Sequence, residues 1–376
     1  MAPGANNAGK HLLLVGGGHA HVLVLEAFAR DPEPGLHVTL VSRDPLTPYS
    51  GMLPGHLAGI YTRDEIHIDL ERLARAGGAK LIRDEAIGFD AGNRRVRLKG
   101  GQEQSYDILS IDIGITPDLS GIAGADEHAL VVKPIGRLLE QWDRLVERAL
   151  EAKGPRSFAI VGGGAAGICL AFAVSAFFRT RISDPVHVSL IGESKAPGIN
   201  PGMRRRIAQA LKHRRIAVHT GDAAVGIEQD GVTLASGRHV PADAVLVSTH
   251  GAAPPVLAGT SWAKDDGGFL AIRPTLQILN DDAVFAAGDC ATMVAHPRPK
   301  AGVFAVRQGP VLARNLRRAV RGDALGSYIP QRDHLMLIAT GDGRAIGGRR
   351  RFMAFEGRLA WRLKDFIDRR FMRRFG

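Results

Sequence analysis

A length of 376 residues exceeds what one ordinary core needs and predicts two or three domains. The composition, 45% hydrophobic and 23% charged, argues against disorder. The two cysteines, Cys169 and Cys290, form no CxxC pair, which argues against a disulfide framework and against a cysteine-rich zinc site. We therefore expect no bound metal. The net charge of +11 is concentrated from Arg344 onward, where eleven basic residues oppose three acidic ones, which favours a local anionic partner such as a lipid surface over nucleic acid.

The first predicted elements are a buried parallel strand at Leu12–Val15 and a helix that ends near Arg30. The glycines at 16–18 lie between them, and His21 takes the place of the third glycine of a GxGxxG dinucleotide fingerprint. That glycine normally allows close packing of helix and strand, so we expect the helix to stand further off or His21 to point sideways. His19, in the first helical turn, is either a catalytic group or a polar residue at a helix start.

A second predicted strand, LHVTLVSRD, ends at Ser42, Arg43 and Asp44 without a clear carboxylate at its tip for a ribose. The loop RDPLTPYSGMLPGH follows it directly and is rich in Pro and Gly. Either a cofactor contact or a surface turn with ordinary tyrosine packing agrees with this composition.

The second fingerprint has no irregularity. A predicted strand at Phe158–Val161 leads into Gly162, Gly164 and Gly167, which fit GxGxxG. These glycines allow a tight turn, close approach of the backbone to a pyrophosphate, and close packing of a helix whose N-terminus faces the phosphates. One such loop is weak evidence, but two of them favour a dinucleotide protein over two glycine-rich turns without a ligand.

The strand after the second fingerprint, HVSLIGES, ends at Glu193. A carboxylate there accepts hydrogen bonds from ribose hydroxyls and repels a 2′-phosphate, which favours NADH over NADPH. Lys195, His213 and Arg214 lie near in sequence and weaken this preference.

Further along, DDAVFAAGDCATM predicts a strand at Ala283–Ala286 that leads into Gly288 and Asp289. Together with VGGGHAH, SIDIGITP, VGGGAAG and the Glu193 strand, in this order, the stretch resembles the two-dinucleotide-binding-domain flavoproteins of the pyridine nucleotide–disulfide oxidoreductase superfamily. The resemblance covers about residues 10–330.

The resemblance implies an α/β fold with two Rossmann-like domains, in which an NAD domain is inserted between the halves of an FAD domain. The expected parts are the FAD half-domains 10–117 and 254–328, the NAD(P)H-binding domain 118–253 and a basic amphipathic C-terminal region 329–376. The implied FAD contacts are Gly16, Gly17, Gly18, His19, Ala20, Ser42, Arg43, Thr47, Tyr49, Ser50, Gly114, Gly288, Asp289, Gly302 and Val303, and the implied NAD contacts are Gly162, Gly164, Ala165, Gly167 and Glu193.

A helix is predicted over Lys300–Leu316, with a kink at Gly309-Pro310 as one outcome. Its start should face the pyrimidine edge of FAD and stabilise negative charge there. Lys300 is either a contributor to that effect, and the one candidate catalytic side chain, or a solvated lysine.

The missing cysteine pair disfavours disulfide and sulfide chemistry and leaves hydride transfer to flavin. In that respect the chain resembles type II NADH dehydrogenases and, more closely, the flavoprotein module fused to some selenophosphate synthetases. Type II enzymes have two glutamines at the start of the helix, whereas this chain has Val303 and Arg307, which puts a standard quinone pocket in doubt.

The tail predicts one basic amphipathic helix whose apolar stripe is formed by Phe352, Phe355, Leu359, Leu363, Phe366, Ile367, Phe371 and Phe375. Such a helix would lie in an anionic membrane interface or dock on the flavin domain or in a homodimer. The chain has no apolar run long enough to span a bilayer, and MAPGANNAGK lacks the apolar part of a secretory signal, so we expect a cytoplasmic protein, peripheral on the inner face of the membrane if the tail binds lipid.

The function expected from these patterns is FAD-dependent NAD(P)H oxidoreduction with a non-thiol acceptor, a quinone first. Oxidoreduction of a selenium or sulfur metabolite, and a flavin-bound redox sensor or adaptor with little turnover, are the alternatives.

Overall fold

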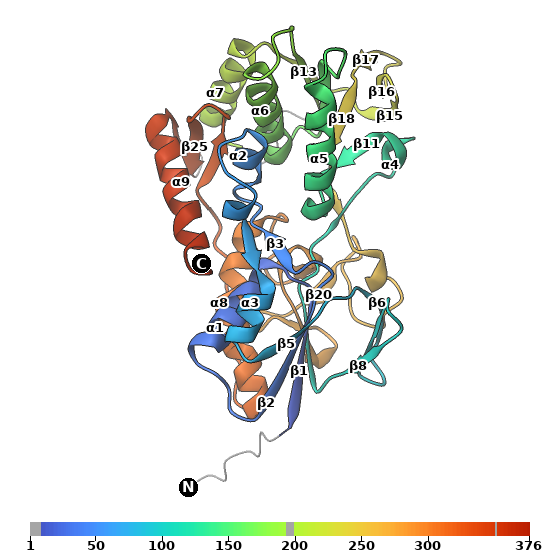
Figure 1. The fold of residues 1–376 in the computed structure, drawn as a ribbon. Helices are drawn as coiled ribbons and strands as arrows, with labels where there is room; N and C mark the ends of the chain where they lie inside the picture. The colour runs from blue at the N-terminus through green and yellow to red at the C-terminus, as the bar shows by residue number, and fades with distance from the viewer. Residues whose placement is uncertain (1–8, 193–198, 350–351) are drawn as a thin grey trace.

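The computed structural model describes residues 9–192, 199–349 and 352–376. Figure 1 shows two α/β lobes, one around strands β1, β2 and β5 and the other around β13 and β18, with helix α9 lying along one side of both. The arrangement of parallel sheets is that of two Rossmann-like domains, so the predicted fold class is confirmed.

The larger sheet of the described chain has eight strands and is built from two separate stretches of sequence. In spatial order the strands are β23 (Ala291–Met293), β20 (Leu270–Ile272), β21 (Gln277–Ile278), β22 (Asp281–Ala286), β9 (Ile108–Ile111), β1 (Lys10–Val15), β2 (Leu36–Val41) and β5 (Ala79–Ile82). The strands β22, β9, β1, β2 and β5 pair in parallel, so their carboxyl ends meet at one edge, where dinucleotides bind in this kind of sheet.

The second sheet lies wholly within the stretch expected to bind NAD. Its parallel strands are, in spatial order, β11 (Ala129–Val131), β18 (Ala244–Val247), β12 (Ser157–Val161), β13 (His187–Gly192) and β14 (Ile216–Thr220). A short antiparallel sheet and four helices complete this lobe: β15 (Ala224–Glu228), β16 (Gly231–Leu234), β17 (His239–Pro241), α4 (Ala125–His128), α5 (Ile135–Ala149), α6 (Ala165–Arg179) and α7 (Pro201–His213).

The lobes are joined by two strands that pair with each other, β10 (Thr116–Pro117) and β19 (Gly251–Ala252). They lie at the domain boundaries that the sequence analysis expects. This pairing supports the boundaries at 117 and 253, which remain a proposal.

Helices on the larger sheet pack closely because a glycine lies at their contact. α1 (His19–Arg30) packs against α8 (Gly302–Arg321), and a Cβ on Gly309 would be 2.6 Å from the Leu23 side chain. The kink that the sequence analysis gave as one outcome does not interrupt the helix, since α8 continues through Pro310 as one element.

Separate apolar cores surround the two sheets, and the strands β1 and β12 are buried in them.

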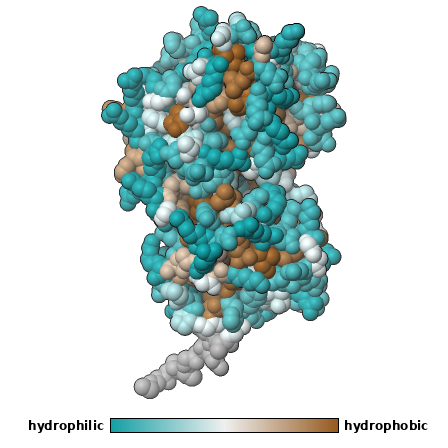
Figure 2. All heavy atoms as spheres, viewed as in Figure 1, coloured by the Kyte–Doolittle hydropathy of each residue, from teal (hydrophilic) through white to brown (hydrophobic). Residues whose placement is uncertain are grey.

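Smaller elements lie outside the larger sheet. In the first lobe they are β3 (Leu46–Pro48), β4 (His67–Asp69), α3 (Leu70–Ala76), β6 (Ala86–Asp90), β7 (Arg95–Leu98) and β8 (Glu103–Ser105), whereas α2 (Leu53–Leu57) packs against α6 of the other lobe. Figure 2 shows that the face in view carries apolar residues in separate patches on both lobes as well as at the narrow waist between them.

The tail corrects one prediction, because its apolar residues do not lie on one helix. An antiparallel sheet comes first, made of β24 (Met336–Ala339), β25 (Ala345–Arg349) and β26 (Met353–Gly357), and the helix α9 spans only Arg358–Met372. Phe355 therefore lies in a strand, and Phe371 and Phe375 are buried against the flavin-side lobe. No helix among the described residues is both long and apolar enough to cross a membrane.

Candidate functional site

The first glycine turn follows β1 directly. Gly16 has a φ of +100°, and a Cβ at this position would be 2.3 Å from the carbonyl oxygen of Asp112. Its N–H donates to the carbonyl of Val41 at 2.8 Å, which ties the turn to the end of β2. Only glycine fits here, so the turn that presents the start of α1 to a phosphate is preserved.

His21 replaces the third glycine by pointing sideways, one of the two outcomes expected. Its ring contacts the Gly16 carbonyl through Nδ1 at 2.7 Å and the Ser110 hydroxyl through Nε2 at 2.8 Å. Burial lowers the His21 pKa to about 4, so the ring is neutral at pH 7. Since a carbonyl only accepts, Nδ1 carries the hydrogen and Nε2 accepts from Ser110.

Asp112 is a site residue that the sequence analysis missed. It follows β9, and its carboxylate accepts the Ala20 N–H at 2.8 Å and the His21 N–H at 3.4 Å, so it caps the start of α1. It fits tightly, since a Cβ on Gly18 or Gly288 would approach its carboxyl group to 2.2–2.3 Å. Burial raises the Asp112 pKa to about 7, against the lowering effect of the two amides.

The Gly288–Asp289 turn faces this glycine turn across the strand ends. The Gly288 N–H donates to Oε1 of Gln308 at 2.8 Å, which fixes the turn to α8. Asp289 is paired with Lys133 of the other lobe, Nζ to Oδ2 at 2.7 Å, and only 13% of its side chain is exposed. A ribityl hydroxyl would therefore meet a carboxylate that is already neutralised by a lysine.

The loop after β2 brings its predicted residues to the same place. The ring of Tyr49 lies edge-on to that of His19, with 5.4 Å between centroids. Ser50 lies at the start of α8, because a Cβ on Gly302 would be 3.3 Å from its hydroxyl oxygen. Val303 follows Gly302 in the first turn of α8.

Other predicted contacts lie further out along the same edge. The Ser42 hydroxyl donates to the carbonyl of Asp44 at 2.9 Å, and Arg43 forms a half-exposed ion pair with the Asp44 carboxylate. Thr47 lies in β3, paired with Ile68 of β4.

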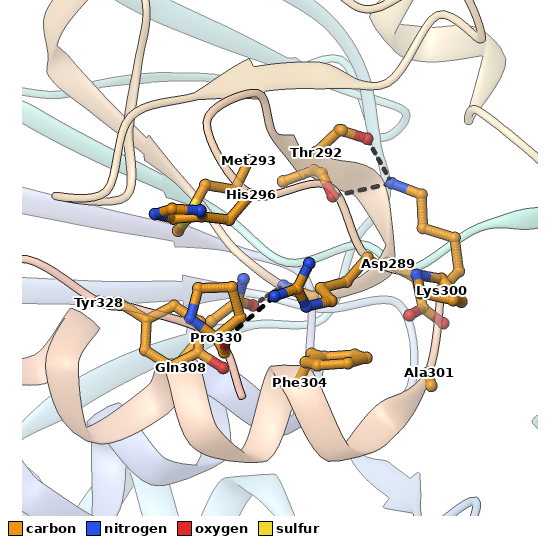
Figure 3. A pocket seen from close by; sticks show the side chains of 14 residues that line it. Asp289, Thr292, Met293, His296, Lys300, Ala301, Phe304, Gln308, Tyr328 and Pro330 are labelled. Atoms are coloured by element: carbon orange, nitrogen blue, oxygen red, sulfur yellow. Dashed lines mark hydrogen bonds between the residues drawn. The ribbon is translucent and has the colours of Figure 1, made fainter. Parts of the chain in front are cut away.

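Lys300 is directed away from the start of α8. Its ammonium donates to the carbonyl of Ala291 and to the hydroxyl of Thr292, both at 2.8 Å, and lies 3.8 Å from the ring centre of Phe269 (Figure 3). Burial lowers its pKa. These contacts favour a structural role over the catalytic one for which it was a candidate.

The residues present fit an FAD. The Nε2 atom of His19 is shielded from solvent and has no hydrogen-bond partner, so it is available to a ligand atom. Gly114 leaves open space beside the strand ends, since a Cβ there would meet nothing within 4 Å. The helices α1 and α8 begin at His19 and Gly302, beside these strand ends, and the N-terminal end of a helix favours negative charge.

The second glycine turn has the same design with tighter packing. Gly162 has a φ of +136°, and a Cβ on Gly167 would be 1.8 Å from the Gly162 carbonyl oxygen. A Cβ on Gly164 would meet nothing within 4 Å, and Ala165 begins α6. The turn therefore has an open side on which a pyrophosphate fits. Glu193, the predicted ribose ligand, lies outside the described residues.

Two hollows adjoin the flavin-side site. A cavity of about 30 Å³ between β23 and α8 is lined by Asp289, Phe304, Gln308 and Tyr328 (Figure 3) and has room for only a few water molecules. A wider hollow of about 850 Å³ lies between the β3–β4 hairpin and α9, and its size is that of a ligand pocket. Among the described residues, no group of three or more His, Cys, Asp or Glu side chains is placed to hold a metal ion.

The sequence also matches a known protein family. The model described as pyridine nucleotide-disulphide oxidoreductase matches residues 10–309. The chain belongs to this family. Pyridine nucleotide-disulphide oxidoreductases of this kind use FAD and NAD(H), which confirms the expected cofactors.

Relatives and solved structures agree with this family. The chain is 27% identical over 232 residues to a probable NADH dehydrogenase of Dictyostelium discoideum, which covers 56% of the chain and 51% of that protein, so the match spans about half of its length. It is 22% identical over 326 residues to an NADH dehydrogenase-like protein of Bacillus subtilis, covering 86% of the chain and 87% of that protein. The structure of NDH2 from Plasmodium falciparum in complex with NADH has a TM-score of 0.81 at 13% identity and covers 96% of both chains.

The chain departs from the disulphide chemistry in the family's name. Cys169 and Cys290 are both free and buried, one in α6 and the other after Asp289. Burial raises the pKa of the Cys169 thiol to about 11 and that of Cys290 to about 12, so neither is a reactive thiolate near neutral pH.

Proposed function

We propose that the chain is an FAD-dependent NADH oxidoreductase that passes two electrons to a quinone at a membrane surface. The observation that carries the acceptor is the 850 Å³ hollow between the β3–β4 hairpin and α9. Phe366 of α9 lines it and is 54% exposed, and Leu359, Leu363 and Ile367 of the same helix are also exposed. A hollow that opens next to exposed apolar side chains suits an acceptor that arrives from lipid.

Each glycine turn has its own part in this function. Gly162 and Gly164 admit the pyrophosphate of NADH at the start of α6, and Gly16 and Gly18 hold that of FAD at the start of α1. The bound flavin supplies the hydride and electron chemistry. The first-turn amides of α8 stabilise negative charge at the pyrimidine edge. NADH is preferred over NADPH because of Glu193.

The assignment is tested by anaerobic titration of the purified holoprotein with NADH, followed by a short-chain quinone. We expect the flavin absorbance to bleach with about one NADH per flavin and to recover on addition of quinone. Recovery only with oxygen would contradict the quinone acceptor and direct the search to selenium and sulfur compounds. A flavin that NADH does not bleach would instead support a sensor with little turnover.

Membrane contact through α9 gives a second prediction. Leu359 and Ile367 are 77% and 40% exposed, and arginines of the same helix surround them. The double variant L359S/I367S should lose at least about tenfold in binding to vesicles that contain anionic lipid, because each apolar side chain contributes about 1–2 kcal/mol of transfer energy. Turnover of a short-chain quinone should stay within about twofold, because that acceptor needs no membrane.

The matched control is I87S, which removes an apolar side chain of similar exposure, 53%, from the small β6–β8 sheet. Vesicle binding should be unchanged by I87S. Equal binding of the double variant and the native protein would show that α9 serves another contact, such as a homodimer interface.

A further inference from the structure

The small cavity between β23 and α8 is lined by two cationic side chains, Arg298 and Lys300 (Figure 3). Its volume of about 30 Å³ has room for a few water molecules or for one ion of similar size. Pro299, another residue of the lining, is exposed, so an occupant can enter from solvent. What such a space binds depends on the charges and the hydrogen-bonding groups around it.

The charges around this cavity do not balance. In the described part of the chain, neither Arg298 nor Lys300 forms an ion pair, and both donate hydrogen bonds only to carbonyl and hydroxyl oxygens. The one carboxylate of the lining, Asp289, is already paired with Lys133. A charge that is partly withdrawn from water is costly without a partner of opposite sign. The cavity therefore lacks negative charge.

Hydrogen-bond donors of the lining are also left over. A guanidinium has five N–H groups, and Arg298 uses three of them on carbonyl oxygens. The Oε1 atom of Gln308 accepts the Gly288 N–H, which leaves the NH₂ end of that amide for another partner. Tyr328 is only 7% exposed, and its hydroxyl has no hydrogen-bond partner among the described residues. A ligand with several acceptor oxygens would satisfy all three side chains.

We propose that the cavity is a binding site for a small planar oxyanion, either an inorganic one such as nitrate or the carboxylate of an organic acid. Such a group has about three or four non-hydrogen atoms, which agrees with the volume of the cavity. Its planar oxygens match the guanidinium of Arg298, and its charge offsets those of Arg298 and Lys300. Binding involves no electron transfer, so this site is independent of the acceptor proposed above.

Two exposed apolar side chains separate the two sources of the anion. Val294 and Ile329 are 51% and 74% exposed, and each is next in sequence to a residue of the lining. A carboxylate with an apolar tail would place that tail beside them, whereas an inorganic anion would not use them.

The test follows the thermal midpoint of the purified holoprotein during titration with sodium nitrate or sodium formate at constant ionic strength. A ligand that binds only the folded state raises the midpoint, and the dissociation constant follows from the concentration dependence. Y328F should raise that constant at least about tenfold, because a hydrogen bond to a charged group contributes about this factor. The matched control is Y106F: Tyr106 is 5% exposed, its hydroxyl also has no partner among the described residues, and it does not line the cavity. Its dissociation constant should be native.

A second pair of variants tests the charge. K300M removes one cation of the cavity and should also weaken binding at least about tenfold. The matched control is K264M, because Lys264 is a half-buried lysine that donates to two carbonyl oxygens and lies outside the cavity lining. Each variant is compared with its control at the same salt concentration, so general effects of salt on stability cancel.

Longer carboxylates identify the source of the anion. Tighter binding of acetate and butyrate than of formate would support the carboxylate of an organic acid, and binding of nitrate and formate alone would support an inorganic anion. The proposal would be overturned if none of these anions raised the midpoint of the native protein more than that of K300M. Equal dissociation constants for Y328F and Y106F would also overturn it.

Discussion

Replacing Gly164 by valine should leave the fold and the bound flavin intact and lower kcat/KM for NADH about 100-fold, the loss expected when a substrate is displaced by about 1 Å. A Cβ at this position meets no atom of the described residues within 4 Å, and the backbone, with φ of −77° and ψ of −179°, is open to any residue. The side chain is therefore expected to obstruct a ligand on the open side of the turn. Steady-state kinetics with NADH, together with the flavin spectrum and the thermal midpoint, measure the effect.

The matched control is G259V. Gly259 is also a glycine at which a Cβ would meet nothing within 4 Å, and it lies in a turn far from either glycine loop in sequence. Both variants should have the thermal midpoint of the native protein. A G164V protein with the native kcat/KM for NADH would show that NADH does not bind at the second fingerprint. The assignment of FAD to the first glycine loop and NADH to the second would then be wrong.

Local glycine chemistry explains why the sequence predicted the two dinucleotide sites. The positive φ of Gly16 and Gly162 and the contact between Gly167 and the Gly162 carbonyl are backbone requirements that only glycine meets, so they leave a mark in the sequence. His21 was also predictable in outline, because a side chain in that place has to turn aside.

Residues whose role depends on contacts between distant segments were not predictable. Asp112 is one of several residues at the end of a buried strand, and only the fold brings it to the start of α1, 91 to 92 positions away in the chain. The pairing of Lys133 with Asp289 crosses from one lobe to the other. No periodic pattern in the sequence predicts the contact of Asp112 with α1 or the ion pair of Lys133 with Asp289.

The tail shows a different limit. Its apolar residues follow helical spacing from Phe352 onward, yet the first of them belong to a β-hairpin. Gly347 and Gly348 allow this, because β25 packs in close contact with Phe355 and Met203 at these two positions. The spacing of the apolar residues predicted the helix that begins at Arg358, but it did not indicate which face of that helix packs against the rest of the protein. The buried Lys364–Asp368 pair shows that a polar stretch of α9 faces inward while Leu359 faces solvent.

Asp112 should make the first glycine turn sensitive to pH. Its carboxyl group has a pKa near 7 in the folded protein, against an ordinary value of 3.8, and a shift of one unit corresponds to about 1.4 kcal/mol. The folded chain therefore binds this proton more tightly than the unfolded chain, and the stability that Asp112 contributes is expected to fall as pH rises from about 4 to about 7. The anionic pyrophosphate of FAD adds charge beside the same group, so flavin affinity should fall up to about tenfold per pH unit above pH 7.

D112N should remove the Asp112 contribution to both dependences, because the amide oxygen still accepts the Ala20 N–H while the charge is gone. Flavin affinity is measured by fluorescence from pH 6 to 8, and stability by urea unfolding from pH 5 to 8. Burial lowers the pKa of several histidines, so the stability that they contribute rises with pH over the lower part of this range, and the contribution of Asp112 is therefore the difference between the native protein and D112N. D44N, which removes an exposed carboxylate at the end of β2, should keep the native pH dependence. A D112N protein that still lost flavin above pH 7 would show that the group whose deprotonation lowers flavin affinity is not Asp112. The contact between Asp112 and the start of α1 would then be structural only.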